Sequence, residues 1–284
     1  MEIINRRQRM ASLSRKLRRE NKTVGFVPTM GALHEGHLSL VKEAKQMCDI
    51  VIVSIFVNPA QFNQGDDFKS YPRDLTSDAA LLAEYQIDYI FAPDTREIYG
   101  ENFGTCVFVE NLTETLEGAA RPGHFRGVAT VVTILFNTIR PDYAFFGQKD
   151  AQQVAVIKRL TQDLGFDTEI VVGRIVREES GLAMSSRNVH LSEAERDAAT
   201  SIFQGLRAAK IAAREGERNA AELIEIVRRK IEVESVAKID YIAVVDNETL
   251  VPIDRIEDEP VLIAVAVLFG KTRLIDNTIL NRRQ

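Results

Sequence analysis

The most constraining feature of this sequence is an almost continuous apolar run, Ile50 to Val57, in which β-branched residues dominate. A strand with one solvent-exposed face alternates apolar and polar residues, whereas a continuous apolar run predicts a strand that is buried on both faces, as in parallel sheets. Shorter runs of this kind predict further strands at Val24 to Val27, Ile87 to Phe91, Thr105 to Val109 and Tyr143 to Phe146. The chain must therefore provide helices for both faces of a sheet.

Amphipathic stretches with helical spacing lie between these strands. They predict helices at about Gly36 to Met47, Asp74 to Tyr85, Gly127 to Ile139 and Ala151 to Leu164. Repeated strand, helix, strand units imply a parallel sheet with helices on its two faces. Ligands of such sheets gather at the carboxyl ends of the strands.

The pattern changes beyond about Gly173, where helices and strands are no longer interleaved. Two helical stretches, Ser192 to Arg214 and Ala220 to Glu234, precede three strand candidates. Segregated helices and strands predict a separate, smaller α+β domain, so we expect an α/β domain in residues 1–173 and the α+β domain in residues 174–284. The strand candidates are Tyr241 to Val245, Val261 to Leu268 and Thr272 to Asp276.

The composition excludes several classes of protein. With 45% hydrophobic and 27% charged residues, the chain of 284 residues is expected to fold throughout. The net charge of −5 argues against nucleic acid as a partner, because covering phosphates along a strand normally needs a basic excess. Neither the Arg-rich start nor any later stretch offers a signal-peptide core or a membrane span, so the cytoplasm is the expected location. Cys48 and Cys106 are expected to be reduced core cysteines.

The first run with chemical content extends from Pro28 to His37, between a buried strand and an amphipathic helix. Gly31 and Gly36 permit close backbone approach, and the amides at a helix N-terminus favour anions such as phosphate. His34 and His37 are three residues apart and share one face. The positive end of the helix dipole disfavours imidazolium, so both rings are expected to act as neutral hydrogen-bond donors.

Two competing interpretations of the histidine pair stay open at this point. Both side chains could serve only to cap the turn. A zinc site would need at least a third ligand, and His124 and His190 are the only other histidines.

Two further polar runs follow strands or precede the second domain. Gly147 to Asp150 lies where an apolar strand ends and a helix begins, so Lys149 should face the same carboxyl edge as the histidines. Gln152 and Gln153 follow on that helix and could bind a polar ligand or face solvent. The run Ala183 to Asn188 sets two hydroxyls beside an arginine, a compact set of phosphate contacts that is also common loop material.

A fourth run, Phe56 to Asn63, closes the central strand. It brings the amide of Gln61 to the ligand edge beside apolar Phe62. This mixture suits a small branched hydroxy acid better than a flat base. A simple loop after the strand is the alternative.

Together these runs carry a family resemblance. The turn ending in His34-Glu35-Gly36-His37 and the loop Met184-Ser185-Ser186-Arg187 resemble the two nucleotide signatures of class I aminoacyl-tRNA synthetases and related nucleotidyltransferases, which bind ATP and act at its α-phosphate. With the Gln61 run, Tyr71-Pro72-Arg73 and the segment Gly123 to Val128, the chain resembles the pantothenate synthetase family over essentially its whole length. The resemblance implies a Rossmann-like N-terminal domain, a smaller C-terminal lid domain and a homodimer.

The resemblance also implies an activity and a set of site residues. The activity is the ligation of pantoate to β-alanine through an acyl-adenylate, with ATP as substrate and Mg²⁺ as its companion. His34, His37 and Lys149 would be catalytic, with His37 the usual candidate proton donor; Gln61 and Gln153 would hold pantoate, and Gln61 would also border β-alanine. The residues implied to bind ATP are Met30, Gly31, Ala32, Leu33, His34, Glu35, Gly36, His37, Gly147, Gln148, Lys149, Asp150, Val176, Met184, Ser185, Ser186 and Arg187.

Acidic residues after the Tyr-Pro-Arg segment are linked to magnesium in this family. This chain offers Asp74 and Asp78 in uncertain register, so no protein ligand to magnesium is assigned.

Three other functions compete with this one. A nucleotidyltransferase for a phosphorylated acceptor would want more basic residues near the acceptor than the Gln61 run provides. An RNA-binding module related to the synthetases conflicts with the acidic net charge. A purely ligand-sensing protein would bind without turnover.

Overall fold

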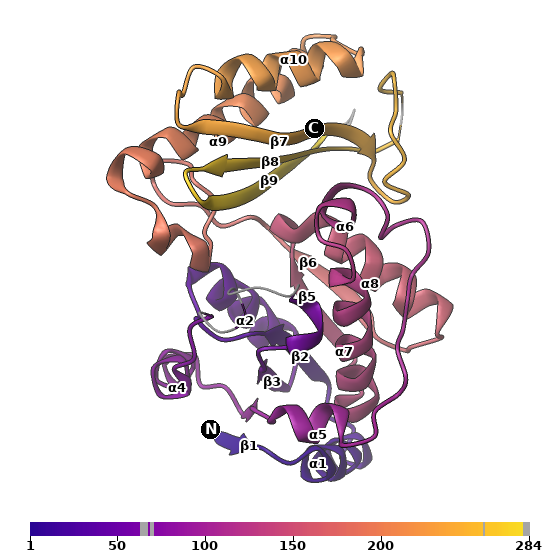
Figure 1. Cartoon of the computed structure of the whole chain (residues 1–284). Coiled ribbons are helices and arrows are strands. Elements are labelled where there is room, and N and C mark those ends of the chain that lie inside the picture. The colour runs from indigo at the N-terminus through magenta and orange to yellow at the C-terminus, as the bar shows by residue number, and fades with distance from the viewer. Residues whose placement is uncertain (63–67, 69–70, 258, 281–284) are drawn as a thin grey trace. The chain divides into compact units, whose positions relative to one another are not determined.

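The computed structural model describes residues 1–62, 68, 71–257 and 259–280, so Asn63 of the Gln61 run lies outside the described residues. The chain forms two compact units. The first comprises Met1–Gly147 and Val156–Gly173, and the second comprises Gln148–Ala155 and Arg174–Gln284 (Figure 1). The expected division at residues 173 and 174 stays a prediction.

The first unit is built on a six-stranded parallel sheet with the order β1-β4-β3-β2-β5-β6. From β2 the chain runs outward through β3 and β4 on one side, and β5 and β6 extend the other side. The order therefore reverses between β2 and β5, and the carboxyl ends of strands beside such a switch point are where ligands of open α/β sheets bind. The strands are β1 (Glu2–Ile4), β2 (Val24–Thr29), β3 (Ile50–Ile55), β4 (Tyr89–Phe91), β5 (Tyr143–Gly147) and β6 (Glu169–Gly173).

Strand β2 shows why the sheet needs helices on both faces. Successive side chains of a strand point to opposite faces. Val27 packs with Leu38 and Val41 of α2 (Glu35–Met47), whereas the ring of Phe26 lies 6.3 Å from that of Phe136 on α7 (His124–Ile139). Both residues are fully buried. The continuous apolar runs are thus explained by burial on two sides.

The chain up to residue 173 has seven further helical segments among its described residues. Helix α1 packs against α7, and its buried residues include Met10 and Leu17. The bounds are α1 (Arg7–Arg19), η1 (Pro59–Gln61), α4 (Leu75–Glu84), α5 (Thr95–Tyr99), α6 (Leu116–Ala120), η2 (Gln148–Asp150) and α8 (Ala151–Asp163).

The strand predicted at Thr105 to Val109 is wrong. The structure has no strand in this segment, which is described throughout. The Val107 amide donates to the Thr130 hydroxyl of α7 at 3.0 Å. A helix side chain thus accepts the hydrogen bond that the backbone of a neighbouring strand would otherwise accept. The prediction of a core cysteine at Cys106 is wrong too, because Cys106 is exposed; Cys48 is partly buried.

The second unit contains a three-stranded antiparallel sheet with the order β7-β8-β9 and two helices, which Figure 1 shows on one side of that sheet. Side chains of both helices and of β8 and β9 form one core that includes Ile202, Leu223 and Ile263. Ser192 and Glu195 form a capping box that begins α9. The elements are η3 (Ser186–His190), α9 (Glu193–Arg214), α10 (Ala220–Ile231), β7 (Ala237–Asp246), β8 (Val261–Phe269) and β9 (Thr272–Leu280).

The predicted fold class is confirmed: a Rossmann-like parallel sheet is joined to a smaller α+β part with a separate antiparallel sheet. Across the described part of the chain, every helix is too short or too polar to cross a bilayer.

Candidate active site

The turn between β2 and α2 has an unusual backbone. Gly31 and Ala32 both adopt positive φ, +82° and +51°. Only glycine takes this region without strain, so Ala32 must be held there by its surroundings. The Gly31 amide donates to the Thr29 hydroxyl at 3.2 Å, and that hydroxyl donates to the Ser54 carbonyl of β3. The turn is therefore tied to the carboxyl end of the central strand.

Asp78 on α4 is the second anchor of this turn. Its carboxylate accepts the amides of Ala32 at 3.1 Å and Leu33 at 2.9 Å, and it is only 4% exposed. A Cβ on Gly31 would lie 2.8 Å from the Asp78 carboxylate, so the approach is close enough to require glycine. Asp74, by contrast, caps α4 by accepting the Ser77 amide.

His34 and His37 form a reciprocal cap at the start of α2. The Nδ1 of His34 accepts the Gly36 amide at 3.1 Å, and the Nδ1 of His37 accepts the His34 amide at 3.3 Å. The ring centroids lie 4.1 Å apart. Because each Nδ1 is an acceptor, a neutral ring carries its proton on Nε2. Capping and hydrogen-bond donation are therefore compatible roles for one imidazole, not competing ones.

The amide of Gln61 is held in a defined orientation. Its Oε1 accepts from Asn58 Nδ2 at 3.1 Å, and its Nε2 donates to the sulfur of Met30 at 3.0 Å. Gln61 is 8% exposed and Asn58 only 1%. Asn58 also donates to the Gly127 carbonyl and accepts from the Tyr99 hydroxyl. Burial raises the pKa of Tyr99 to about 12, which keeps this donor a phenol. Gln61 thus presents its N–H side toward Met30.

Helix α7 packs against η1, the segment that contains Gln61. A Cβ on Gly127 would overlap the backbone oxygen of Ala60 and lie 2.5 Å from the Gln61 nitrogen. The Nδ1 of His124 lies 2.9 Å from the Gln61 carbonyl. The segment Gly123 to Val128, which carries part of the family resemblance, therefore also supports the backbone that precedes and includes Gln61.

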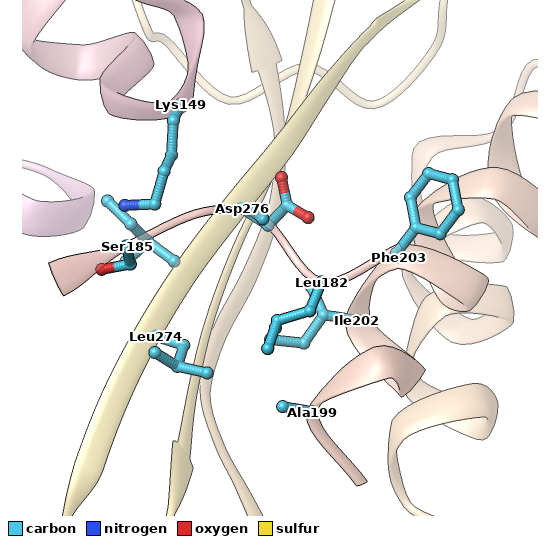
Figure 2. A pocket seen from close by; sticks show the side chains of 10 residues that line it. Lys149, Leu182, Ser185, Ala199, Ile202, Phe203, Leu274 and Asp276 are labelled. Carbon is cyan, nitrogen blue, oxygen red and sulfur yellow. The ribbon is translucent and has the colours of Figure 1, made fainter. Parts of the chain in front are cut away.

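In the second unit, Lys149 and Ser185 line one small pocket (Figure 2). Apolar side chains from α9 and β9, among them Ile202 and Leu274, form most of the rest of its wall. Lys149 extends from η2 toward this pocket, and Asp276 of β9 also lines it.

The loop Met184 to Arg187 is fixed by its neighbours. The Met184 amide donates to the Val176 carbonyl at 2.9 Å, so these two residues implied to bind ATP are adjacent. Ser185 caps η3 by accepting the Arg187 amide at 3.2 Å. Asn188 donates to the Ala183 carbonyl.

Each unit therefore assembles part of the predicted set of site residues. The first brings Gln61 to Met30 and pairs His34 with His37; the second gathers Lys149, Ser185 and their neighbours. Gln153 is partly buried on α8, and Asp150 is exposed. The sequence analysis did not assign an anchoring role to Asn58, nor to Asp78, which it named only in connection with magnesium. Gly31 was a usable signal for Asp78, because a glycine at a turn implies a close neighbour.

Among the described residues, no group of three or more His, Cys, Asp or Glu side chains is placed to hold a metal ion. Both oxygens of Asp78 accept backbone amides, and Asp74 caps a helix.

The parallel sheet and its switch point define a Rossmann-like α/β protein of the nucleotide-binding type. The model of the family described as pantoate-beta-alanine ligase matches residues 2–279. The chain belongs to this family.

Curated and solved relatives agree with this assignment. Pantothenate synthetase from Heliobacterium modesticaldum is 52% identical over 98% of this chain and 99% of its own, and that from Caldicellulosiruptor bescii is 50% identical over 100% of both. The crystal structure of pantothenate synthetase from Thermus thermophilus has a TM-score of 0.90 at 43% identity, covering 98% of this chain and 99% of its own. The pantoate-beta-alanine ligase of Francisella tularensis, complexed with beta-gamma ATP and beta-alanine, has a TM-score of 0.81 at 36% identity, covering 98% and 97%.

Proposed function

We propose that this protein condenses (R)-pantoate with β-alanine at the expense of ATP, through a pantoyl-adenylate, and releases pantothenate, AMP and diphosphate. The observation that carries the proposal is the family match over residues 2–279. The Francisella relative that was crystallised with an ATP compound and β-alanine supports two of the substrates.

The reaction has two steps that balance without a covalent enzyme nucleophile. A pantoate carboxylate oxygen attacks the α-phosphorus of ATP, and the bond to the β-phosphate oxygen breaks, which releases diphosphate. The β-alanine nitrogen then attacks the carboxyl carbon, the bond to AMP breaks and the amine loses a proton. Catalysis therefore depends on holding the reactants in line and on stabilising charge on the phosphates.

Histidines 34 and 37 are proposed to donate to the phosphates through Nε2. The acceptor role of both Nδ1 atoms in the cap of α2 supports this assignment, because it fixes the tautomer of the neutral ring. Magnesium enters with ATP as part of the substrate.

Lys149 and Arg187 are proposed to supply positive charge, and Ser185 and Ser186 to supply hydroxyls, to the same nucleotide. The further residues proposed to contact ATP are Met30 to Leu33, Glu35, Gly36, Gly147, Gln148, Asp150, Val176 and Met184.

Gln61 and Gln153 are proposed to hold pantoate, and Gln61 also to border β-alanine. The orientation of Gln61 supports a donor role, since Asn58 occupies its oxygen. A donated N–H suits a hydroxyl or carboxylate oxygen of a small hydroxy acid.

We further propose that the protein is a cytoplasmic homodimer, that it has no nucleic-acid or membrane partner, and that residues 174–284 act as a lid. Phe103 and Phe108 are exposed large apolar side chains on the first unit. Sedimentation equilibrium at a mass near twice 31.9 kDa would support the dimer.

Exchange of labelled diphosphate into ATP tests the adenylate. If pantoate attacks before β-alanine takes part, the first step is reversible on the enzyme, so exchange should require pantoate and magnesium but not β-alanine. A ligase that uses an acyl-phosphate would release ADP and show no such exchange. A nucleotidyltransferase would show exchange only with its own phosphorylated acceptor. Lack of pantoate-dependent exchange by enzyme that binds ATP would overturn the proposal.

A further inference from the structure

Asn277 on β9 holds the backbone of the Lys149 segment. Its Nδ2 donates to the carbonyls of Gln148 at 2.9 Å and Lys149 at 3.0 Å, and its Oδ1 accepts from the Gln148 side chain at 3.0 Å. The residue is 3% exposed. A buried amide that both donates and accepts can satisfy this set, whereas most other side chains cannot.

The preceding residue, Asp276, anchors a second segment. Its carboxylate accepts two hydrogen bonds from Arg177, at 2.6 and 3.0 Å, and Arg177 donates in turn to the Gly181 carbonyl at 3.1 Å. The guanidinium also lies over the ring of Phe203, 4.4 Å from its centroid. Bidentate pairs of this kind fix geometry as well as charge. Two neighbouring residues of one strand thus hold the Lys149 segment and the hairpin that leads to Ser185.

Lys149 needs such support because of its own chemistry. A lysine has a flexible stem and a compact charge, so the position of its ammonium depends on how firmly its backbone is held. Figure 2 shows Lys149 extending from that backbone toward the pocket that Ser185 and Asp276 also line. Misplacement of a catalytic group by about 1 Å can cost on the order of 10²-fold in rate.

We infer that Asn277 is a positioning residue of the ligase reaction and that it acts through Lys149. The inference rests on the proposed role of Lys149 at the phosphates. Asn277 does not touch the substrates in this scheme; it sets the backbone from which Lys149 reaches them.

A double-mutant cycle tests the inference. Lys149→Ala is expected to lower kcat by about 10²-fold or more. Asn277→Asp has almost the same volume but sets a carboxylate against two carbonyl oxygens, and it should lower kcat by about tenfold or more. In the Lys149→Ala background, Asn277→Asp should change kcat by less than about twofold, because there is no lysine left to position. The matched control, Asn247→Asp in the turn after β7, should keep wild-type kcat.

The outcomes separate the inference from the proposed function. Thermal unfolding of each variant shows whether it folds, and Asn277→Ser, which keeps one donor, replaces Asn277→Asp if the latter does not. If a folded Asn277 variant keeps wild-type kcat while Lys149→Ala is impaired, the inference is overturned and the role of Lys149 stands. The inference would also be overturned if the Asn277 substitution lowered kcat by the same factor with and without Lys149. A general structural effect lowers kcat by that factor in either background, because it does not depend on the lysine. Wild-type turnover by Lys149→Ala would overturn the role of Lys149 and, with it, this inference.

Discussion

The ring of His34 caps α2 and is proposed also to donate to the phosphates, and the two roles can be separated by substitution. We expect His34→Ala to lower the free energy of unfolding by about 1 kcal/mol, because the cap acceptor is lost, and to lower turnover as well. His34→Asn keeps a side-chain acceptor at the cap but lacks the imidazole Nε2. It should recover the stability and not the turnover, as measured by denaturant unfolding and steady-state kcat. Wild-type turnover by His34→Asn would show that the ring only caps the helix.

Gln61 is expected to act on pantoate and not on ATP. Gln61→Ala should raise the KM for pantoate by about tenfold or more, since a lost buried hydrogen bond costs about 1 to 3 kcal/mol. Gln153→Ala should behave alike, and Gln162→Ala, an exposed change on the same helix as Gln153, serves as the control. Steady-state kinetics with each substrate varied in turn provide the measurement. An effect on the KM for ATP alone would contradict this division of the pocket.

At the scale of elements, the packing of α7 on η1 depends on Gly127. The added methyl group of Gly127→Ala would meet backbone atoms of Ala60 and Gln61, which cannot rotate away as a side chain can. We expect a loss of about 1 to 3 kcal/mol in the free energy of unfolding and a raised KM for pantoate, because Gln61 is displaced.

Gly104→Ala is the matched control, since a Cβ there would have no neighbour within 4 Å. Its unfolding midpoint in urea should equal that of the wild type. A Gly127→Ala variant with the same midpoint and kinetics would contradict the proposed packing constraint.

Most elements were predictable because burial leaves a periodic trace. The run from Ile50 predicted β3, and stretches with helical spacing predicted α2 and α9. The strands β1 and β6 lie at the sheet edges and are short or only partly buried, so their runs carry little signal. The Arg-rich surface of α1 hid the buried stripe of Met10 and Leu17. Thr105 to Val109 has strand-forming residues, but α7 takes the place of a neighbouring strand.

Contacts among the candidate site residues were predictable only where the residues are close in sequence. The histidine cap forms within four residues, so its spacing could be recognised. Asp78 lies 45 and 46 residues from the amides it binds, and Asn277 lies 128 and 129 residues from its carbonyl partners. No local sequence pattern predicts such contacts, because they arise from how strands and helices pack.

At the scale of the whole molecule, the fold should protect one of its two thiols. Burial raises the pKa of Cys48 to about 11, and the thiolate is the reactive form, so Cys48 should resist alkylation until the pH approaches that value. Cys106 is exposed. We expect iodoacetamide at pH 8 to modify one cysteine per native chain and two in denaturant, as counted by mass spectrometry. Rapid modification of Cys48 in the native protein would contradict the burial of its side chain.

The place of Asn277 in the chain has a consequence for synthesis. A ribosome delivers His34, Gln61 and Lys149 well before it delivers β9, so a nascent chain carries its reactive groups before it carries the side chain that fixes the lysine. A chain that is released before Thr272 lacks Asn277, and it also lacks Leu274 and Leu280 of the core of the second unit, so we expect it to have lost turnover. Synthesis of β9 would then be the step that completes the support of Lys149.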